Sequence, residues 1–264
     1  HTLVRVMGTS TCDISVSAPE VTANKTVRGI CGQVEGSVIP GLVGLEAGQS
    51  AFGDLLAWFK DVLSWPVDNL VLTSDILSAE QKEELKAEID SDFIRKLSDA
   101  AEAIPHNEAI PVALDWINGR RTPDANQELE AAITNLNMGT RAPHIFKALV
   151  NAICFGSKKI MDRFADEGIE IKTVVGIGGV ARKSKFIMQS LANTLNVPIK
   201  VAASDQAPAL GAAVYAAVAA GIYPDVITAS QTLGSDYEAE SQPQPQYLQN
   251  FSEQMERYEA LSVF

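Results

Sequence analysis

This sequence of 264 residues lacks runs of basic residues, long apolar segments and an apolar leader. Its 21 lysines and arginines are outnumbered by 33 aspartates and glutamates and are scattered, so the electrostatic footprint of nucleic-acid binding is missing. No apolar run reaches the roughly 18 residues that a membrane span needs. No basic-then-apolar leader precedes the first strand pattern. We therefore expect neither a nucleic-acid partner nor a membrane.

Cysteine and histidine are also rare. Cys12, Cys31 and Cys154 are widely spaced and form no C-x-x-C pair, which argues against a zinc site or a disulfide framework. The pattern predicts buried thiols in a reducing cytoplasm. The three histidines are far apart, and G-x-S-x-G, H-E-x-x-H and Walker motifs are absent. An acyl or peptide hydrolase is therefore a remote alternative.

What is present begins with a hairpin pattern in residues 3–16. Val4 and Val6 are predicted to share one face and Ile14 and Val16 another, on either side of the turn-forming stretch GTSTCD. Residues 29–45 are rich in glycine and β-forming residues and predict a third strand with its loops. A short strand is expected at about 110–116.

Helical periods follow. From Ser50 one side of a helix carries Phe52, Leu55, Leu56, Phe59, Val62 and Leu63. Residues 78–104 repeat an apolar residue every four positions among many charges, which predicts a solvated helical insertion. Pro143 suits the first turn of a long helix that carries Ile145, Leu149, Ile153, Ile160 and Phe164 on one face.

The last third alternates strands and helices. Strands are expected at 172–177, followed by a helix through Leu195, and at 199–202, followed by a helix capped by Ser204 or Asp205. After Tyr223 the composition becomes polar. We predict an α/β fold in which an antiparallel hairpin opens a mixed sheet. The expected division is one domain at 1–227, with the insertion at about 78–104, and a polar linker and terminal helix at 228–264.

Both ends of the chain resemble cuts in a longer polypeptide. His1 stands directly before a strand pattern, and the sequence stops at Phe264 inside a helical pattern. We expect further sequence on both sides.

Two glycine-containing turns are candidate phosphate sites. At Gly8–Thr11 small residues expose backbone N–H groups, and Thr9 and Ser10 add hydroxyl donors, although such a tip is often only a turn. At Gly176–Gly179 a strand enters a helix, where glycines let a ligand approach the backbone and the helix start favours negative charge. Tight packing of strand on helix is the alternative.

Two further stretches carry polar candidates. Glu46 stands among glycines before a helix, where its carboxylate could bind a polyol or simply complement the helix dipole. Gly53 inside that helix costs roughly 1 kcal/mol in helix propensity, which suggests a close approach by a ligand or a neighbouring helix. Arg120 and Arg121 could grip a phosphate or a carboxylate, or be solvated loop residues.

In this order the motifs resemble the second half of the FGGY carbohydrate kinases, most closely the L-ribulokinase type. The resemblance runs from Leu3 to about Gly221. It rests on the series GTSTCD, GICGQVEGSVIPGLVGLEAGQSAFGDLLAWF, LDWINGRRTP, GTRAPHIFKALVNAICFG, GIGGVARKS and SDQAPALGAA. It implies an ATPase domain of the actin/hexokinase-like (ribonuclease H-like) fold.

The resemblance also implies site residues. Those expected to bind nucleotide are Gly8, Thr9, Ser10, Gly53, Gly178, Gly179, Lys183 and Ser184. Glu46 matches a position that reaches the ketopentose. At Ala57 this chain departs from relatives that have glutamine, so one nucleotide contact is missing. The family's catalytic base is an aspartate before the GTST hairpin, so this chain supplies no catalytic residue, and Asp13 is a poor substitute.

The implied function is transfer of the γ-phosphoryl group of ATP, with Mg²⁺, to a ketopentose, most closely L-ribulose in L-arabinose catabolism. The N-terminal domain of the same protein would be the partner, with a homo-oligomer left open, and the isolated half would be inactive. Another pentulose or polyol kinase such as xylulokinase, or a non-catalytic actin-like nucleotide-binding module, is the alternative.

Overall fold

The computed structural model describes residues 1–22 and 25–263. The strands are β1 (Thr2–Met7), β2 (Thr11–Ser17), β3 (Gly32–Glu35), β4 (Val43–Ala47), β5 (Val112–Ala113), β6 (Ile133–Thr134), β7 (Thr173–Ile177), β8 (Ile199–Ala202) and β9 (Tyr237–Ser241). The helices are α1 (Pro19–Thr22), α2 (Gly53–Pro66), α3 (Ala79–Glu102), α4 (Ala142–Asp166), α5 (Gly179–Lys183), α6 (Lys185–Leu195), α7 (Ala207–Ala219), α8 (Val226–Leu233) and α9 (Leu248–Leu261). Two short helical turns, the π-helix Val67–Val71 and the 3-10 helix Pro245–Tyr247, complete the elements.

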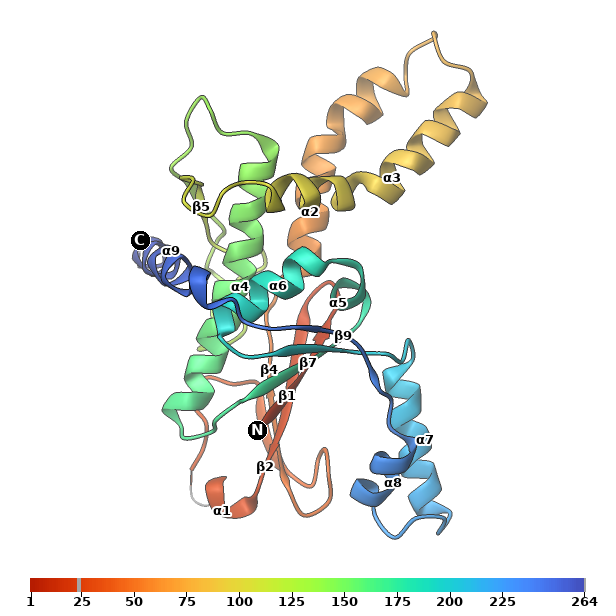
Figure 1. The fold of residues 1–264 in the computed structure, drawn as a ribbon, viewed down its shortest axis with the longest axis vertical. Helices are drawn as coiled ribbons and strands as arrows, with labels where there is room; N and C mark the ends of the chain where they lie inside the picture. The colour runs from red at the N-terminus through yellow and green to blue at the C-terminus, as the bar shows by residue number, and fades with distance from the viewer. Residues whose placement is uncertain (23–24, 264) are drawn as a thin grey trace.

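Seven of these strands form one mixed sheet in the order β3-β4-β2-β1-β7-β8-β9. The strands β1, β7 and β8 run parallel, and the other neighbours are antiparallel. Figure 1 shows this sheet in the centre, with α2 and α3 reaching away from it at one end and α7 and α8 at the other. The α/β class and the hairpin that opens a mixed sheet are confirmed.

The hairpin β1–β2 forms as predicted, but the assignment of its faces was wrong. Val4 lies directly opposite Ile14, so the four β-branched residues named above share one half-buried face. The fully buried face carries Leu3, Arg5 and Met7, and its Leu3 and Met7 belong to the same core cluster as apolar residues of α4 and α6. Alternation alone shows which residues share a face and not which face a helix will cover.

A buried ion pair lies on that covered face. Arg5 and Asp13 are opposite each other in the ladder and are both inaccessible to solvent. The guanidinium donates from Nε to Oδ1 at 2.6 Å and from Nη2 to Oδ2 at 2.7 Å. Each ion is desolvated, so the pair depends on this two-bond geometry. Both oxygens of the Asp13 carboxylate are therefore already paired with Arg5 inside the core.

The long helix α4 provides most of the covering layer. Pro143 stands in its first turn, as predicted, and the side that faces the sheet buries residues along the whole length. The predicted core positions Leu149, Ile153, Ile160 and Phe164 are buried, and Ile145 is half-buried. The apolar period of about 3.6 residues was therefore a correct guide here.

The helices α2 and α3 form the arm that extends from the sheet (Figure 1). The α3 helix confirms the predicted amphipathic helix and begins with a capping box in which Ser78 and Gln81 exchange side-chain and backbone hydrogen bonds. On the predicted apolar face of α2, Phe52, Leu55, Leu56 and Phe59 are buried, Leu63 is half-buried and Val62 is 51% exposed.

Several boundaries differ from the expectations. The region 29–45 yields two strands, β3 and β4, instead of one, and the expected strand at 110–116 is only the two-residue β5. The helix after β7 is divided at Ser184 into α5 and α6. Ser204 and Asp205 do not cap α7, because that helix starts after Gln206, and Ser204 instead accepts from the Gln206 amide.

The C-terminal segment is more ordered than a linker. Residues 237–241 form β9, which pairs with β8 as the edge strand of the main sheet. The terminal helix is confirmed as α9, which packs against α4, α6 and β5. Among the cysteines Cys154 is buried as expected, whereas Cys31 is exposed because it precedes the edge strand β3. Within the described residues no helix has the length and apolar character of a membrane span.

The buried ion pair generates a stability prediction. Replacing Asp13 with alanine leaves the Arg5 guanidinium desolvated without its counter-ion, and we expect a loss of about 3–5 kcal/mol of unfolding free energy. Denaturant unfolding measures the change.

The control is Asp92→Ala, which breaks an exposed pair with Arg95 on α3 and should barely change stability. The double variant Arg5→Met with Asp13→Leu should recover much of the loss, because no buried charge remains. Equal effects of the two single alanine variants would contradict a desolvated pair.

Candidate functional site

The candidate site is built around the hairpin tip, which is Gly8–Ser10 between β1 and β2. The tip carbonyls accept hydrogen bonds from the first turn of α2: Phe52 N donates to Thr9 O at 2.9 Å, Gly53 N to Gly8 O at 3.1 Å and Asp54 N to Thr9 O at 3.1 Å. The start of a helix has unpaired N–H groups, and here the hairpin satisfies them. The start of α2 is therefore used to hold the tip.

Gly53 is required by this contact. A Cβ atom at this position would lie 2.4 Å from Gly8 O and 3.2 Å from a methyl group of Val180. The sequence left open whether a ligand or a neighbouring helix approaches Gly53. The structure shows that protein approaches it, and that the neighbours are the hairpin backbone and α5. The same contact brings the hairpin tip, the start of α2 and the loop before α5 together.

The amides of the tip face outward. Gly8 N donates to Ser10 O, but no described residue accepts from the amides of Thr9 and Ser10. Thr9 is exposed and Ser10 is half-buried, and their hydroxyls are on the same turn. Adjacent unpaired N–H groups with hydroxyl donors form an anion-binding concavity.

The two glycines after β7 have different surroundings. Gly178 has φ +99°, and a Cβ there would lie 2.7 Å from Met7 O, so it lets the loop pass the hairpin strand. Gly179 begins α5, is exposed, and a Cβ there would meet nothing within 4 Å. Packing of strand on helix therefore explains Gly178 and leaves Gly179 unexplained.

Lys183 and Ser184 also differ. Lys183 is exposed at the end of α5. Ser184 is buried, and its hydroxyl accepts from Ile187 N at 3.3 Å as the N-cap of α6. The structure therefore gives Ser184 a local role in the helix start.

Glu46 is engaged in a separate group on β4. Its Oε1 accepts from Arg121 Nη2 at 2.8 Å and lies 3.7 Å from Cys12 Sγ. Burial, with Glu46 as the second cause, raises the pKa of the Cys12 thiol and keeps it protonated as a donor. Glu46 is not part of the tip contacts, and its carboxylate is neutralised by an arginine.

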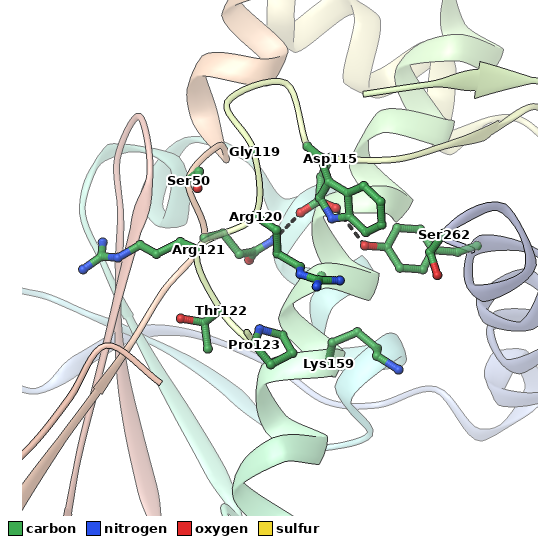
Figure 2. A pocket seen from close by; sticks show the side chains of 13 residues that line it. Ser50, Asp115, Gly119, Arg120, Arg121, Thr122, Pro123, Lys159 and Ser262 are labelled. Atoms are coloured by element: carbon green, nitrogen blue, oxygen red, sulfur yellow. Dashed lines mark hydrogen bonds between the residues drawn. The ribbon is translucent and has the colours of Figure 1, made fainter. Parts of the chain in front are cut away.

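The paired arginines likewise have protein partners. Arg121 points away from the cavity of Figure 2 toward Glu46. Arg120 lies over the Trp116 ring, 5.3 Å from its centroid, and donates to Asp124 O. Neither interpretation from the sequence, a grip on phosphate or carboxylate or a solvated loop, describes these arginines fully. Their side chains tie the loop to the body of the domain.

A buried polar cluster behind the tip was not found from the sequence. Gln49 donates from Nε2 to Asp115 Oδ2 at 2.9 Å, and Tyr258 donates to Asp115 Oδ1 at 2.8 Å. The cluster borders a cavity of about 40 Å³, shown in Figure 2. Burial raises the pKa of the Asp115 carboxyl, and these two hydrogen bonds oppose the rise. The cluster could not be recognised from the sequence, because its glutamine, aspartate and tyrosine are far apart and have no regular spacing.

The described residues hold no cluster of three or more His, Cys, Asp or Glu side chains arranged for a metal ion. Asp54 is the acidic residue in the first turn of α2. Its Oδ1 accepts from Phe52 N, and its Oδ2 accepts from Asn118. The chemistry that the tip itself offers is the binding of an anion by backbone and hydroxyl donors.

Comparison with known proteins identifies the family of the chain. The model of the FGGY family of carbohydrate kinases, C-terminal domain, matches residues 3–220. A ribulokinase of Vibrio parahaemolyticus is 46% identical over 92% of this chain and 42% of its own length. A ribulokinase of Shouchella clausii is 38% identical over 83% of this chain and 36% of its own length. The chain spans less than half the length of these relatives.

Solved structures share the fold. The crystal structure of a xylulose kinase from Rhodospirillum rubrum superposes with a TM-score of 0.75 over 99% of this chain and 46% of that one, at 18% identity. At that identity the likeness concerns the fold alone, which is the actin/hexokinase-like α/β fold predicted above. The family match covers most of the chain, and the ribulokinases match it at high identity. The chain therefore belongs to the FGGY family of carbohydrate kinases and corresponds to their C-terminal domain.

Proposed function

We propose that this chain is the nucleotide-binding half of a kinase that transfers the γ-phosphoryl group of ATP to a ketopentose, L-ribulose. The observation that carries the proposal is the hairpin tip, where the outward amides of Thr9 and Ser10 have no described partner. Phosphoryl transfer depends mainly on positioning and charge stabilisation, which such donors supply. The names of the curated relatives support ribulose as the acceptor.

The donor set fits the phosphates of ATP. Thr9 and Ser10 offer amides and hydroxyls at one turn, and the contact with Gly53 keeps that turn rigid. The open space over Gly179 leaves room for a flat ligand beside the start of α5. We propose that the adenosine part lies over Gly178 and Gly179, with Lys183 available at the rim.

Mg²⁺ fits as part of the nucleotide complex. Since no metal cluster is present among residues 1–22 and 25–263, we propose that the ion is held chiefly by the phosphate oxygens. It would supply charge neutralisation of those oxygens. The tip donors of this chain bind and orient the same phosphates.

The catalytic base is proposed to come from the part of the protein that these relatives have and this chain does not span. A general base must reach the attacking hydroxyl. Asp13 is buried against Arg5, Asp115 is buried against Gln49 and Tyr258, and both oxygens of Asp54 accept hydrogen bonds. These carboxylates are committed to structure, so we assign none of them to catalysis.

The proposed function generates a prediction about activity. A protein that joins this chain to the N-terminal half found in its relatives should convert ATP and L-ribulose to ADP and a phosphorylated pentulose, and should act more slowly on D-xylulose. This chain alone should show no turnover, because it lacks the base.

Product analysis by phosphorus NMR distinguishes the sugars and the two proteins. A preference for D-xylulose would contradict the assigned substrate. Turnover of L-ribulose by the purified chain, above a preparation from cells without it, would contradict the assignment of the base to another segment.

A further prediction separates the roles of Gly178 and Gly179. Gly179→Val places its side chain in open space, so we expect little change in melting temperature but at least about tenfold weaker ADP binding, or 1.4 kcal/mol. Gly178→Ala forces a Cβ toward Met7 O at φ 99° and ψ 176°, a conformation that is essentially restricted to glycine and costs another residue about 1–3 kcal/mol. Its melting temperature should therefore fall.

Calorimetry without ligand and ADP titration on the same preparations give both quantities. Unchanged ADP affinity in a stable Gly179→Val variant would remove the adenosine assignment. A clear loss of stability in that variant would show that Gly179 has a packing role that the open surroundings do not reveal.

A further inference from the structure

A chain of buried polar contacts connects the C-terminal helix α9 with the hairpin tip. Tyr258 of α9 donates to Asp115, Asp115 accepts from the Gln49 side chain, and the Gln49 backbone holds Thr11, the residue after the tip. We propose that Tyr258 is a positioning residue for the nucleotide-binding tip and acts through Asp115 and Gln49. The proposal rests on the nucleotide-binding function proposed above.

The contact between Gln49 and Thr11 is two-sided. Thr11 N donates to Gln49 O at 3.1 Å, and Gln49 N donates to Thr11 Oγ1 at 2.8 Å. Nearby, a Cβ on Gly48 would lie only 2.2 Å from Thr11 O, so the two segments pass in direct backbone contact. Any displacement of Gln49 is therefore passed to the first residue after Gly8–Ser10.

The Gln49 side chain is in turn held from two sides. From α4, Ser157 Oγ donates to Gln49 Oε1 at 2.6 Å, and Gln49 Nε2 donates to Ile153 O at 3.0 Å. From the loop after β5, Asp115 accepts from the same Nε2. A Cβ on Gly156 would lie 2.4 Å from Asp115 Oδ2 and 2.5 Å from Gln49 Nε2, so this junction closes around the pair.

Burial makes each of these bonds costly to lose. Thr11 is 1% exposed, Tyr258 2%, Gln49 3% and Asp115 5%. An Asp115 oxygen that loses its donor must therefore move or find another donor, such as a water in the adjacent cavity of about 40 Å³. Removal of the Tyr258 hydroxyl therefore displaces Asp115, and the displacement reaches Gln49 because the two share one hydrogen bond.

The helix α9 lies outside the part of the chain that the family model matches. The family match ends at residue 220, and Tyr258 belongs to the segment beyond it. The ring of Tyr258 also packs against Phe155 and Trp116, which anchors the helix without the hydroxyl. The aromatic contacts thus keep α9 in place, while the hydroxyl contributes the link to the tip.

The test uses the Tyr258→Phe variant of the 264-residue chain, which keeps the ring and removes only the hydroxyl. Amide NMR spectra without nucleotide should show shifted Thr11 and Gln49 resonances and faster exchange of the Thr11 amide. ADP should bind about tenfold more weakly, which corresponds to the loss of one hydrogen bond to a charged group.

A matched control and a second route sharpen the result. Tyr247→Phe removes a hydroxyl from the residue just before α9, whose ring stacks on His106 and which has no described side-chain hydrogen bond, and it should leave Thr11 and ADP binding unchanged. Ser157→Ala removes a donor to Gln49 from the α4 side and should reproduce the Thr11 and Gln49 shifts.

The proposal is overturned if Tyr258→Phe shifts only resonances around α9, or if it matches Tyr247→Phe at Thr11. A general loss of stability without specific changes at Thr11 and Gln49 would likewise reduce Tyr258 to a packing residue. The spectra are recorded without nucleotide, so they decide the positioning role even when the wild-type chain binds no ADP. Failure of ADP binding in that chain counts against the proposed function alone.

Discussion

The contact on which the candidate site depends is the capping of α2 by the carbonyls of Gly8 and Thr9. A helix start needs acceptors for its free N–H groups, and a hairpin tip needs partners for its carbonyls. Each element here satisfies the other. Because the tip carbonyls point toward α2, the amides of Thr9 and Ser10 point away from that helix and are left without a described partner.

That contact explains why small residues gather at the site. Gly53 and Gly178 are both needed because main-chain oxygens of the hairpin, at Gly8 and Met7, occupy the space a side chain would take. They belong to the scaffold, and they bring α2 and α5 against the hairpin. Gly179 has no such neighbour, so its missing side chain leaves open space beside the tip. Two adjacent glycines thus have different physical roles.

The core beneath the hairpin is more polar than a simple apolar layer. It contains the Arg5–Asp13 pair and the group formed by Gln49, Asp115 and Tyr258, in which most donors and acceptors have described partners. Buried polar groups of this kind are stable only in one geometry, since an unpaired member loses solvation without compensation. They therefore restrict the position of β2 and of the segment before α2 more sharply than apolar packing would.

Local pattern was enough to predict the elements with strong periodicity. The 3.6-residue period located α4 and α3, and the alternation around GTSTCD located the hairpin and its exposed tip, because these signals arise from nearest neighbours along the chain. The order of the motifs likewise led to the family. Weak local signals failed: the two-residue β5 and the edge strand β9 depend on pairing partners distant in sequence.

Only the tertiary structure decided which face and which partner each residue has. Alternation grouped the residues of β1, but the buried side became that of Arg5 because its neighbours Leu3 and Met7 join the core cluster that includes residues of α4 and α6. The sequence could not separate Gly178 from Gly179, since their difference lies in the distance to Met7. Nor could it join Gln49, Asp115 and Tyr258, because a hydrogen bond between residues more than sixty positions apart leaves no periodic trace and exists only once the chain has folded.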